Sequence, residues 1–140
     1  MRKLYILSLV VIIISITSCG PNKEKAFDLV DNAKVVLYNG NPEKAMKKLD
    51  KALSYWDNFY EALYLKACCY DYMKDYDMAI KMLDKAIEVK PNYADAYYTR
   101  AMIKKHHLPN GDYCEDFKLA LENGNISAKE YVEDCKRRNK

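Results

Sequence analysis

The chain repeats its own pattern with a period of 34 residues. Written beneath one another, the segments 26–59, 60–93 and 94–127 carry similar residues in the same columns. A period of about 20 to 50 residues is typical of stacked supersecondary units, so this repeat constrains the fold more than any other feature. The clearest columns hold small or apolar residues: Ala33, Ala67 and Ala101; Ala52, Ala86 and Ala120; Leu49, Leu83 and Phe117; Leu53, Ile87 and Leu121.

Each copy has the pattern of two antiparallel helices. Small side chains such as Ala67 and Ala79 allow two helices to approach closely, and the larger Leu83 and Tyr70 fill the space beside them. Pro91 cannot continue the helix before it. One helix pair cannot bury its apolar face alone, whereas three stacked pairs share a continuous core. The sequence predicts seven helices, over residues 23–38, 42–56, 60–73, 76–89, 94–107, 112–122 and 127–137.

The second copy resembles the tetratricopeptide repeat. Its segment "YLKACCYDYMKDYDMAIKMLDKAIEVKPNY" has the small, aromatic and turn residues of that family in their usual order. The resemblance covers residues 26–127 and implies an all-α, right-handed solenoid of three helix-turn-helix repeats. After the third repeat, Ser127 and Glu130 form a predicted capping box. The segment 127–140 therefore resembles the C-terminal capping helix of such arrays.

The first 18 residues have the order of a secretory signal. A short basic start precedes the apolar stretch from Leu4 to Ile16, which is shorter than the roughly 20 residues that a membrane span requires. The string from Ile16 to Cys19 resembles a bacterial lipobox, which implies cleavage before Cys19 and lipidation of its thiol. We expect residues 19–25 to be a lipidated tether. The protein would then face an extracytoplasmic space, with the outer membrane favoured as its site of attachment.

Charge and motifs argue against several function classes. After removal of residues 1–18 the chain keeps 21 basic and 20 acidic residues, a balance that argues against nucleic-acid binding. His106 and His107 are adjacent on a predicted helix, so their side chains diverge and do not readily hold one metal ion. The sequence has no Gly-rich phosphate loop, serine elbow or CxxC motif. It predicts neither an enzyme nor a cofactor, metal or small-molecule site.

The resemblance implies a partner instead. In tetratricopeptide arrays the first helix of each repeat lines a concave groove that binds another protein or a peptide segment. The chaperone-tail binders of the family clamp a carboxylate there with Lys, Asn and Arg. The corresponding positions here hold Val30, Leu65, Asp95 and Thr99, so that activity is not implied.

The positions that match the groove are aromatic and mixed in charge. Tyrosine suits recognition because it adds a large area and a hydroxyl group at little entropic cost. Several tyrosines could equally belong to the core, and for Tyr64, Tyr72 and Tyr98 both interpretations remain open. The candidate groove residues are Lys34, Tyr38, Glu61, Tyr64, Cys68, Tyr72, Asp95, Tyr98, Met102 and His106.

Cys114 and Cys135 are a candidate disulfide. They are about equally distant from the turn at 123–125, so antiparallel helices would place them at the same height. An exported chain can meet an oxidant. The alternative is that both are small apolar residues that fill the hairpin.

Three functions are compatible with these features. The favoured one is a membrane-anchored, non-catalytic interaction module that binds a partner segment in the groove. The second is a structural subunit of a larger cell-envelope assembly. The third is a metal-handling or thiol-redox protein that uses the cysteines and histidines.

Overall fold

The protein is an all-α solenoid. The structure, a computed structural model, describes residues 21–108 and 112–138. Within these residues all regular elements are helical, and the seven predicted helices are present. In chain order they are α2 (Pro21–Tyr38), α3 (Pro42–Tyr55), α4 (Tyr60–Tyr72), α5 (Tyr76–Val89), α6 (Ala94–His107), α7 (Cys114–Glu122), the 3-10 helix η1 (Ile126–Ala128) and α8 (Lys129–Arg138).

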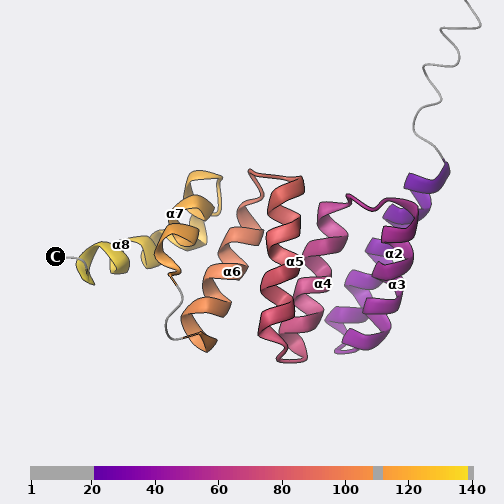
Figure 1. Cartoon of the computed structure of the whole chain (residues 1–140), viewed down its shortest axis with the longest axis horizontal. Helices are drawn as coiled ribbons and strands as arrows, with labels where there is room; N and C mark the ends of the chain where they lie inside the picture. Colours follow the sequence, from indigo (N-terminus) through magenta and orange to yellow (C-terminus); the bar gives the residue numbers. More distant parts are fainter. Residues whose placement is uncertain (1–20, 109–111, 139–140) are drawn as a thin grey trace, which may run out of the picture.

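The helices follow one another in a single row from α2 to α8 (Figure 1). From α2 to α6 successive helices alternate in direction, so α2, α4 and α6 run in the same direction. Each predicted repeat is one helix pair: α2 with α3, α4 with α5, and α6 with α7. The last helix, α8, lies at the end of the row opposite to α2 and packs against α7.

Local sequence explains where the helices begin and end. Asp75 caps α5, because its side-chain oxygen accepts a hydrogen bond from the backbone N–H of Met78 at 3.2 Å. Pro42 stands in the first turn of α3, where its missing N–H would have had no helical partner. The turn before α3 passes through Gly40 in the left-handed region, with φ of +77°. The residue in the same column of the second repeat is Lys74, also left-handed at +63°.

Three of the four columns named in the sequence are buried, and the fourth, with Leu53, Ile87 and Leu121, is half-buried at the edge of the core. Ala67, Ala79 and Ala101 are fully buried, which confirms that small side chains sit at the helix contacts. Three groups of buried side chains succeed one another along the solenoid. Tyr64 packs against the first and second groups, and Ile87 packs against the second and third. The core therefore continues from one repeat to the next.

The structure corrects two predictions about helix starts. Residues 21–25 of the expected tether are helical, because α2 begins at Pro21 rather than at 23. The capping box of Ser127 and Glu130 is not formed either. Asn125 takes the capping role: its side chain accepts a hydrogen bond from the backbone N–H of Ser127 at 3.1 Å. A 3-10 turn follows, so α8 begins at Lys129 rather than 127.

Candidate functional site

The candidate groove residues lie on α2, α4 and α6, the first helices of the three repeats, and we call this surface the first-helix face. Two contacts join its helices. The ammonium of Lys34 on α2 lies 2.6 Å from a carboxylate oxygen of Glu61 on α4. The hydroxyl groups of Tyr64 on α4 and Thr99 on α6 are 3.4 Å apart. Residues of successive repeats therefore meet on one surface.

A hollow of about 210 Å³ opens between α4 and α6 on this face. It brings together the predicted Tyr98, Met102 and His106. It also includes Asp71 and His107, which sequence reasoning missed, although Asp71 directly precedes the candidate Tyr72 and His107 directly follows His106. The complete lining is Asp71, Tyr98, Thr99, Met102, Ile103, His106 and His107.

The hollow combines an apolar floor with ionisable walls. Ile103 is buried and Met102 is half-buried. Burial raises the pKa of the Asp71 carboxyl above its usual value, while the nearby His107 opposes this shift. The imidazole of His107 stacks on the ring of Tyr76, with 3.9 Å between the ring centroids. A ligand group in the hollow would meet an aromatic ring, a thioether, a carboxyl group and imidazoles.

Tyr64 and Cys68 belong as much to the core as to the face. The ring of Tyr64 packs between two core groups and contacts Tyr93, with ring centroids 5.2 Å apart. Burial is the main cause that raises its pKa. Burial likewise raises the pKa of Cys68 to about 11 and that of Cys69 to about 12. Both thiols therefore stay protonated near neutral pH and are poor nucleophiles.

The remaining candidates lie apart from the hollow. Tyr38, at the end of α2, is 93% exposed, and Tyr72, at the end of α4, is 59% exposed. Asp95 is exposed near the start of α6, where it accepts a hydrogen bond from the Asn125 side chain at 3.0 Å. Cys19, the candidate lipidation site, lies outside the described residues.

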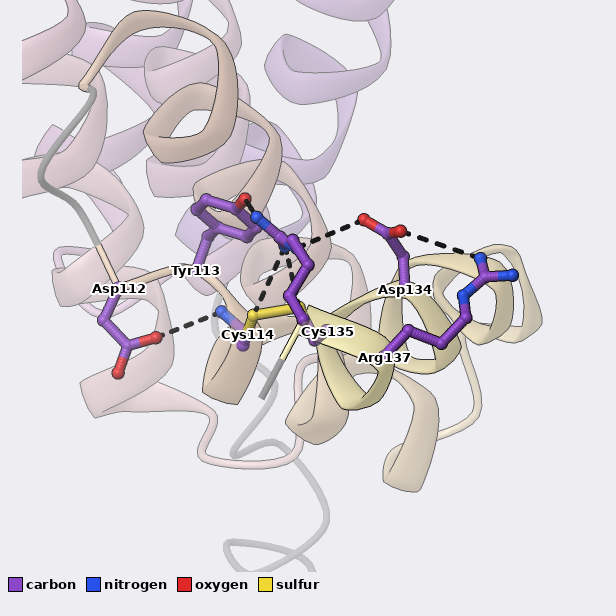
Figure 2. The surroundings of a disulfide bond; sticks show 7 residues. Asp112, Tyr113, Cys114, Asp134, Cys135 and Arg137 are labelled. Atoms are coloured by element: carbon purple, nitrogen blue, oxygen red, sulfur yellow. Dashed lines mark hydrogen bonds and ion pairs between the residues drawn. A yellow bond between two sulfur atoms is a disulfide. The ribbon is translucent and has the colours of Figure 1, made fainter. Parts of the chain in front are cut away.

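The C-terminal cap extends the first-helix face. The ring of Tyr131 on α8 stacks on Phe117 with a centroid distance of 4.4 Å and lies 6.1 Å from the ring of Tyr98. A disulfide joins Cys114, the first residue of α7, to Cys135 on α8, with 5.8 Å between their Cα atoms. Figure 2 shows this bond between the two helices, beside Tyr113.

Arg138 covers the disulfide. Its guanidinium donates a hydrogen bond to the hydroxyl of Tyr113 and lies 3.4 Å from the sulfur of Cys135. A second contact of this guanidinium goes to Asp134, one turn earlier, at 3.4 Å. The last turn of α8 is thus held to the start of α7 by a covalent bond and by side-chain contacts.

Two negative findings concern the described part of the chain. Residues 21–108 and 112–138 hold no group of three or more His, Cys, Asp or Glu side chains that could bind a metal ion. Over the same residues, no helix is both long enough and apolar enough to cross a membrane.

The comparisons agree with the architecture. Residues 60–93 match the family described as Tetratricopeptide repeat, and these are the residues of the predicted second copy. No curated protein matches the chain by sequence.

Several solved structures share the fold. The first tetratricopeptide domain of Spaghetti (RPAP3), bound to the HSP90 peptide SRMEEVD, is 17% identical with a TM-score of 0.75, over 83% of this chain and 96% of that one. The OM64 domain from Arabidopsis is 17% identical with a TM-score of 0.74, over 85% and 99% of the two chains. MamA is 22% identical with a TM-score of 0.69, over 84% and 69%. The protein therefore has the fold of a tetratricopeptide-repeat protein.

Proposed function

We propose that this protein is a membrane-anchored, non-catalytic interaction module that binds a segment of a partner protein on its first-helix face. The observation that carries the proposal is the hollow between α4 and α6, where Tyr98, Met102 and His106 converge. Large aromatic and flexible thioether side chains suit the recognition of another chain, because they offer contact area that adapts to a partner. An extended or helical segment is the expected ligand.

A solved structure with the same fold supports a peptide ligand, and the residues of this chain indicate which kind of peptide it would bind. That structure, the first tetratricopeptide domain of Spaghetti (RPAP3), is bound to an HSP90 peptide. In this chain, two positions of the family's carboxylate clamp hold Val30 and Leu65, which are apolar and buried. A partner of this protein would therefore be selected by apolar and aromatic contacts rather than by a clamped terminal carboxylate.

A photocrosslinking experiment tests the binding face. A photoreactive amino acid is placed at position 102 on α6, and in a control chain at position 89, where the partly exposed Val89 ends α5. In native membranes, the partner should be crosslinked from position 102 and not from position 89. The substitution His106→Glu should weaken this capture about tenfold or more, because it adds a second carboxylate to the hollow that already contains Asp71 and so opposes burial of an apolar partner side chain. Equal crosslinking from both positions would contradict the proposal.

The membrane anchor is the second part of the proposal. Its support is the sequence from Ile16 to Cys19, which has the residues of a lipobox after an apolar stretch. Two or three acyl chains on Cys19 would give lasting attachment, whereas a single chain gives only marginal attachment. The anchor would raise the local concentration of the module at the membrane. We propose that the protein lies in the cell envelope and faces an extracytoplasmic space. The outer membrane is the favoured site of attachment.

Labelling with palmitate tests the anchor. The unaltered chain should incorporate the labelled fatty acid, and its signal segment should be removed. Cys19→Ala should abolish the label and leave an uncleaved precursor. A variant that is still cleaved and still labelled would show that the lipobox interpretation is wrong.

A further inference from the structure

Three aromatic rings gather where the chain enters the solenoid. Trp56, just after α3, stacks on Phe59 with ring centroids 4.5 Å apart. Phe27, on α2, meets both rings edge-on, at 5.7 Å from Trp56 and 4.9 Å from Phe59. Phe59 is buried, whereas Trp56 is half-buried and Phe27 is 45% exposed. The cluster therefore presents aromatic surface to the outside, and we call Phe27 and Trp56 with the neighbouring Lys23 the entry face.

A cationic side chain borders the aromatic rings of the entry face. The ammonium of Lys23 lies 4.6 Å from the centroid of the Trp56 ring. Lys25 and Lys51 line a separate shallow hollow with Tyr55 and Asp28, on the side of α2 that faces away from Lys23 and Phe27. Rings with adjacent lysines are the combination that favours the headgroup level of a bilayer, where the ring body is in a partly apolar medium and the ammonium stays hydrated.

The sequence places the entry face close to the candidate anchor. One residue, Gly20, separates Cys19 from the first residue of α2. Two residue steps span at most about 7 Å, even when fully extended. Phe27 follows Pro21 by six positions, which is roughly 9 Å along a helix. If Cys19 carries acyl chains, the start of α2 is held at the membrane surface, with little freedom to turn the entry face away.

We infer that the entry face docks on the lipid bilayer at headgroup level, beside the anchor. The inference rests on the proposed lipidation of Cys19. Acidic Glu24 and Asp28 accompany the lysines on α2, so docking depends on the aromatic rings more than on net charge and should occur on neutral phosphatidylcholine. A single anchor residue leaves a protein free to rotate, whereas a docked face fixes its orientation.

Docking would direct the candidate binding site away from the membrane. The helices α2, α4 and α6 run in the same direction, and α2 would start at the bilayer (Figure 1). Asp71 and His106 lie near the far ends of α4 and α6. The hollow therefore reaches the edge of the solenoid where α4 and α6 end, opposite to the edge at which α2 starts, so that a docked protein would leave it open to a partner.

The single tryptophan of the chain makes the inference directly measurable. The full-length protein is expressed in a bacterium, and its processed form is reconstituted into phosphatidylcholine vesicles that carry a nitroxide either near the headgroups or deep in the acyl chains. Trp56 fluorescence should be quenched at least about twofold more by the shallow nitroxide than by the deep one. Aqueous iodide should quench it at least about twofold less than in residues 20–140, which lack both the signal segment and the acylated cysteine.

Three variants of the anchored protein provide the controls. Lys23→Glu and Phe27→Glu should both reduce quenching by the shallow nitroxide, because each places beside the Trp56 ring a carboxylate that docking would have to desolvate. Lys23 is exposed, so its variant tests the inference even if Phe27→Glu is unstable. Tyr38→Glu changes another exposed aromatic residue at the opposite end of the same helix and should leave both signals unchanged.

The outcomes separate the two proposals. A protein that incorporates labelled palmitate, while Trp56 stays open to iodide and insensitive to the shallow nitroxide, would overturn docking and leave lipidation intact. A protein without the label would overturn both. Equal effects of Lys23→Glu and Tyr38→Glu would also overturn docking, because they would show that no particular face meets the bilayer.

Discussion

Asp116 shows how a single residue secures the third repeat. Its carboxylate is 4% exposed and accepts hydrogen bonds from Arg100 at 2.6 and 3.0 Å and from Lys104 at 2.8 Å. Arg100 also reaches Asp84 on α5 at 2.6 Å. The guanidinium thus links α5, α6 and α7. The two cations satisfy the buried carboxylate of Asp116. Removing the carboxylate would leave both cations without this partner, in a place where water hydrates them poorly.

We expect Asp116→Asn to lower the free energy of unfolding by about 2 to 4 kcal/mol, because the variant leaves Arg100 and Lys104 without their buried counter-charge. The matched control is Asp84→Asn, which removes the other acidic partner of Arg100. The Asp84 side chain is 56% exposed, so its loss should cost less than about 1 kcal/mol. Urea unfolding of both variants measures the difference. Equal losses of unfolding free energy in the two variants would contradict the argument that the burial of Asp116 makes its ion pairs the more important ones.

At the scale of the element, the turns within the first two repeats each depend on one left-handed residue. Gly40 has this conformation in the first repeat, and Lys74 has it at the matching position of the second. A side chain at positive φ crowds the backbone, which costs roughly 1 kcal/mol for an ordinary residue. The second repeat therefore tolerates a strain that the first one avoids.

Lys74→Gly should raise the free energy of unfolding by about 0.5 to 1 kcal/mol, because glycine relieves this crowding. The reciprocal change, Gly40→Ala, should lower it by about 1 to 2 kcal/mol. An added Cβ at position 40 would also lie 3.1 Å from the Tyr72 hydroxyl. Thermal melting monitored by circular dichroism tests both. If Lys74→Gly lowers the free energy of unfolding, strain at Lys74 does not limit the stability of the second repeat.

The capping helix α8 is the element that depends most on a covalent bond. The disulfide closes a segment with a sequence separation of 21 residues, for which chain entropy predicts a stabilisation of about 3 kcal/mol. Reduction should therefore lower the melting temperature and speed amide hydrogen exchange over residues 129–138 more than in α4. The double variant Cys114→Ala/Cys135→Ala serves as control, because reductant should not affect it further.

The state of this bond in the cell is a separate question with its own measurement. Mass spectrometry of a non-reduced digest should find the peptides of Cys114 and Cys135 linked in protein taken from its native envelope. Free thiols at both positions would show that the two residues only fill the hairpin there. The other two cysteines of the described region, Cys68 and Cys69, are free thiols in the structure.

At the scale of the whole molecule, the two ends of the solenoid differ. One end is covered by α8. At the other, α2 exposes apolar side chains, among them Val35 at 62% and Tyr38 at 93%. A structural subunit of a larger assembly would use such a surface, whereas a free-standing module leaves it in water.

We expect residues 20–140, which lack the signal segment and the acylated cysteine, to be a monomer. The exposed apolar side chains on α2 are interspersed with charged Asp28, Asp31 and Lys34, which opposes tight self-association. Light scattering over a range of concentrations measures the mass, and Val35→Asp should leave it unchanged. A stable oligomer that Val35→Asp dissociates would favour the structural-subunit function instead.

The repeat, its helices and most of its core could be predicted from the order of residues alone. The columns of Ala67, Ala79 and Leu83 are visible because each repeat faces the same neighbours, so packing imposes the same residue types every 34 positions. Helix starts at Pro42 and Tyr76 follow from proline and aspartate chemistry that acts within a few residues. The first-helix candidates Tyr98, Met102 and His106 came instead from the resemblance to tetratricopeptide arrays, whose first helices line a groove.

Only the tertiary structure decided which residues from different helices meet. Asp71 and His107 join the hollow because α4 and α6 lie side by side, and nothing in their own segments indicates this. Tyr64 turned out to pack against two core groups, and Asp116 to be buried between cations. The rings of Phe27 and Trp56 are 29 positions apart in the chain and in contact in the fold. Such contacts depend on the rotation and spacing of packed helices, which a repeat pattern constrains only on average.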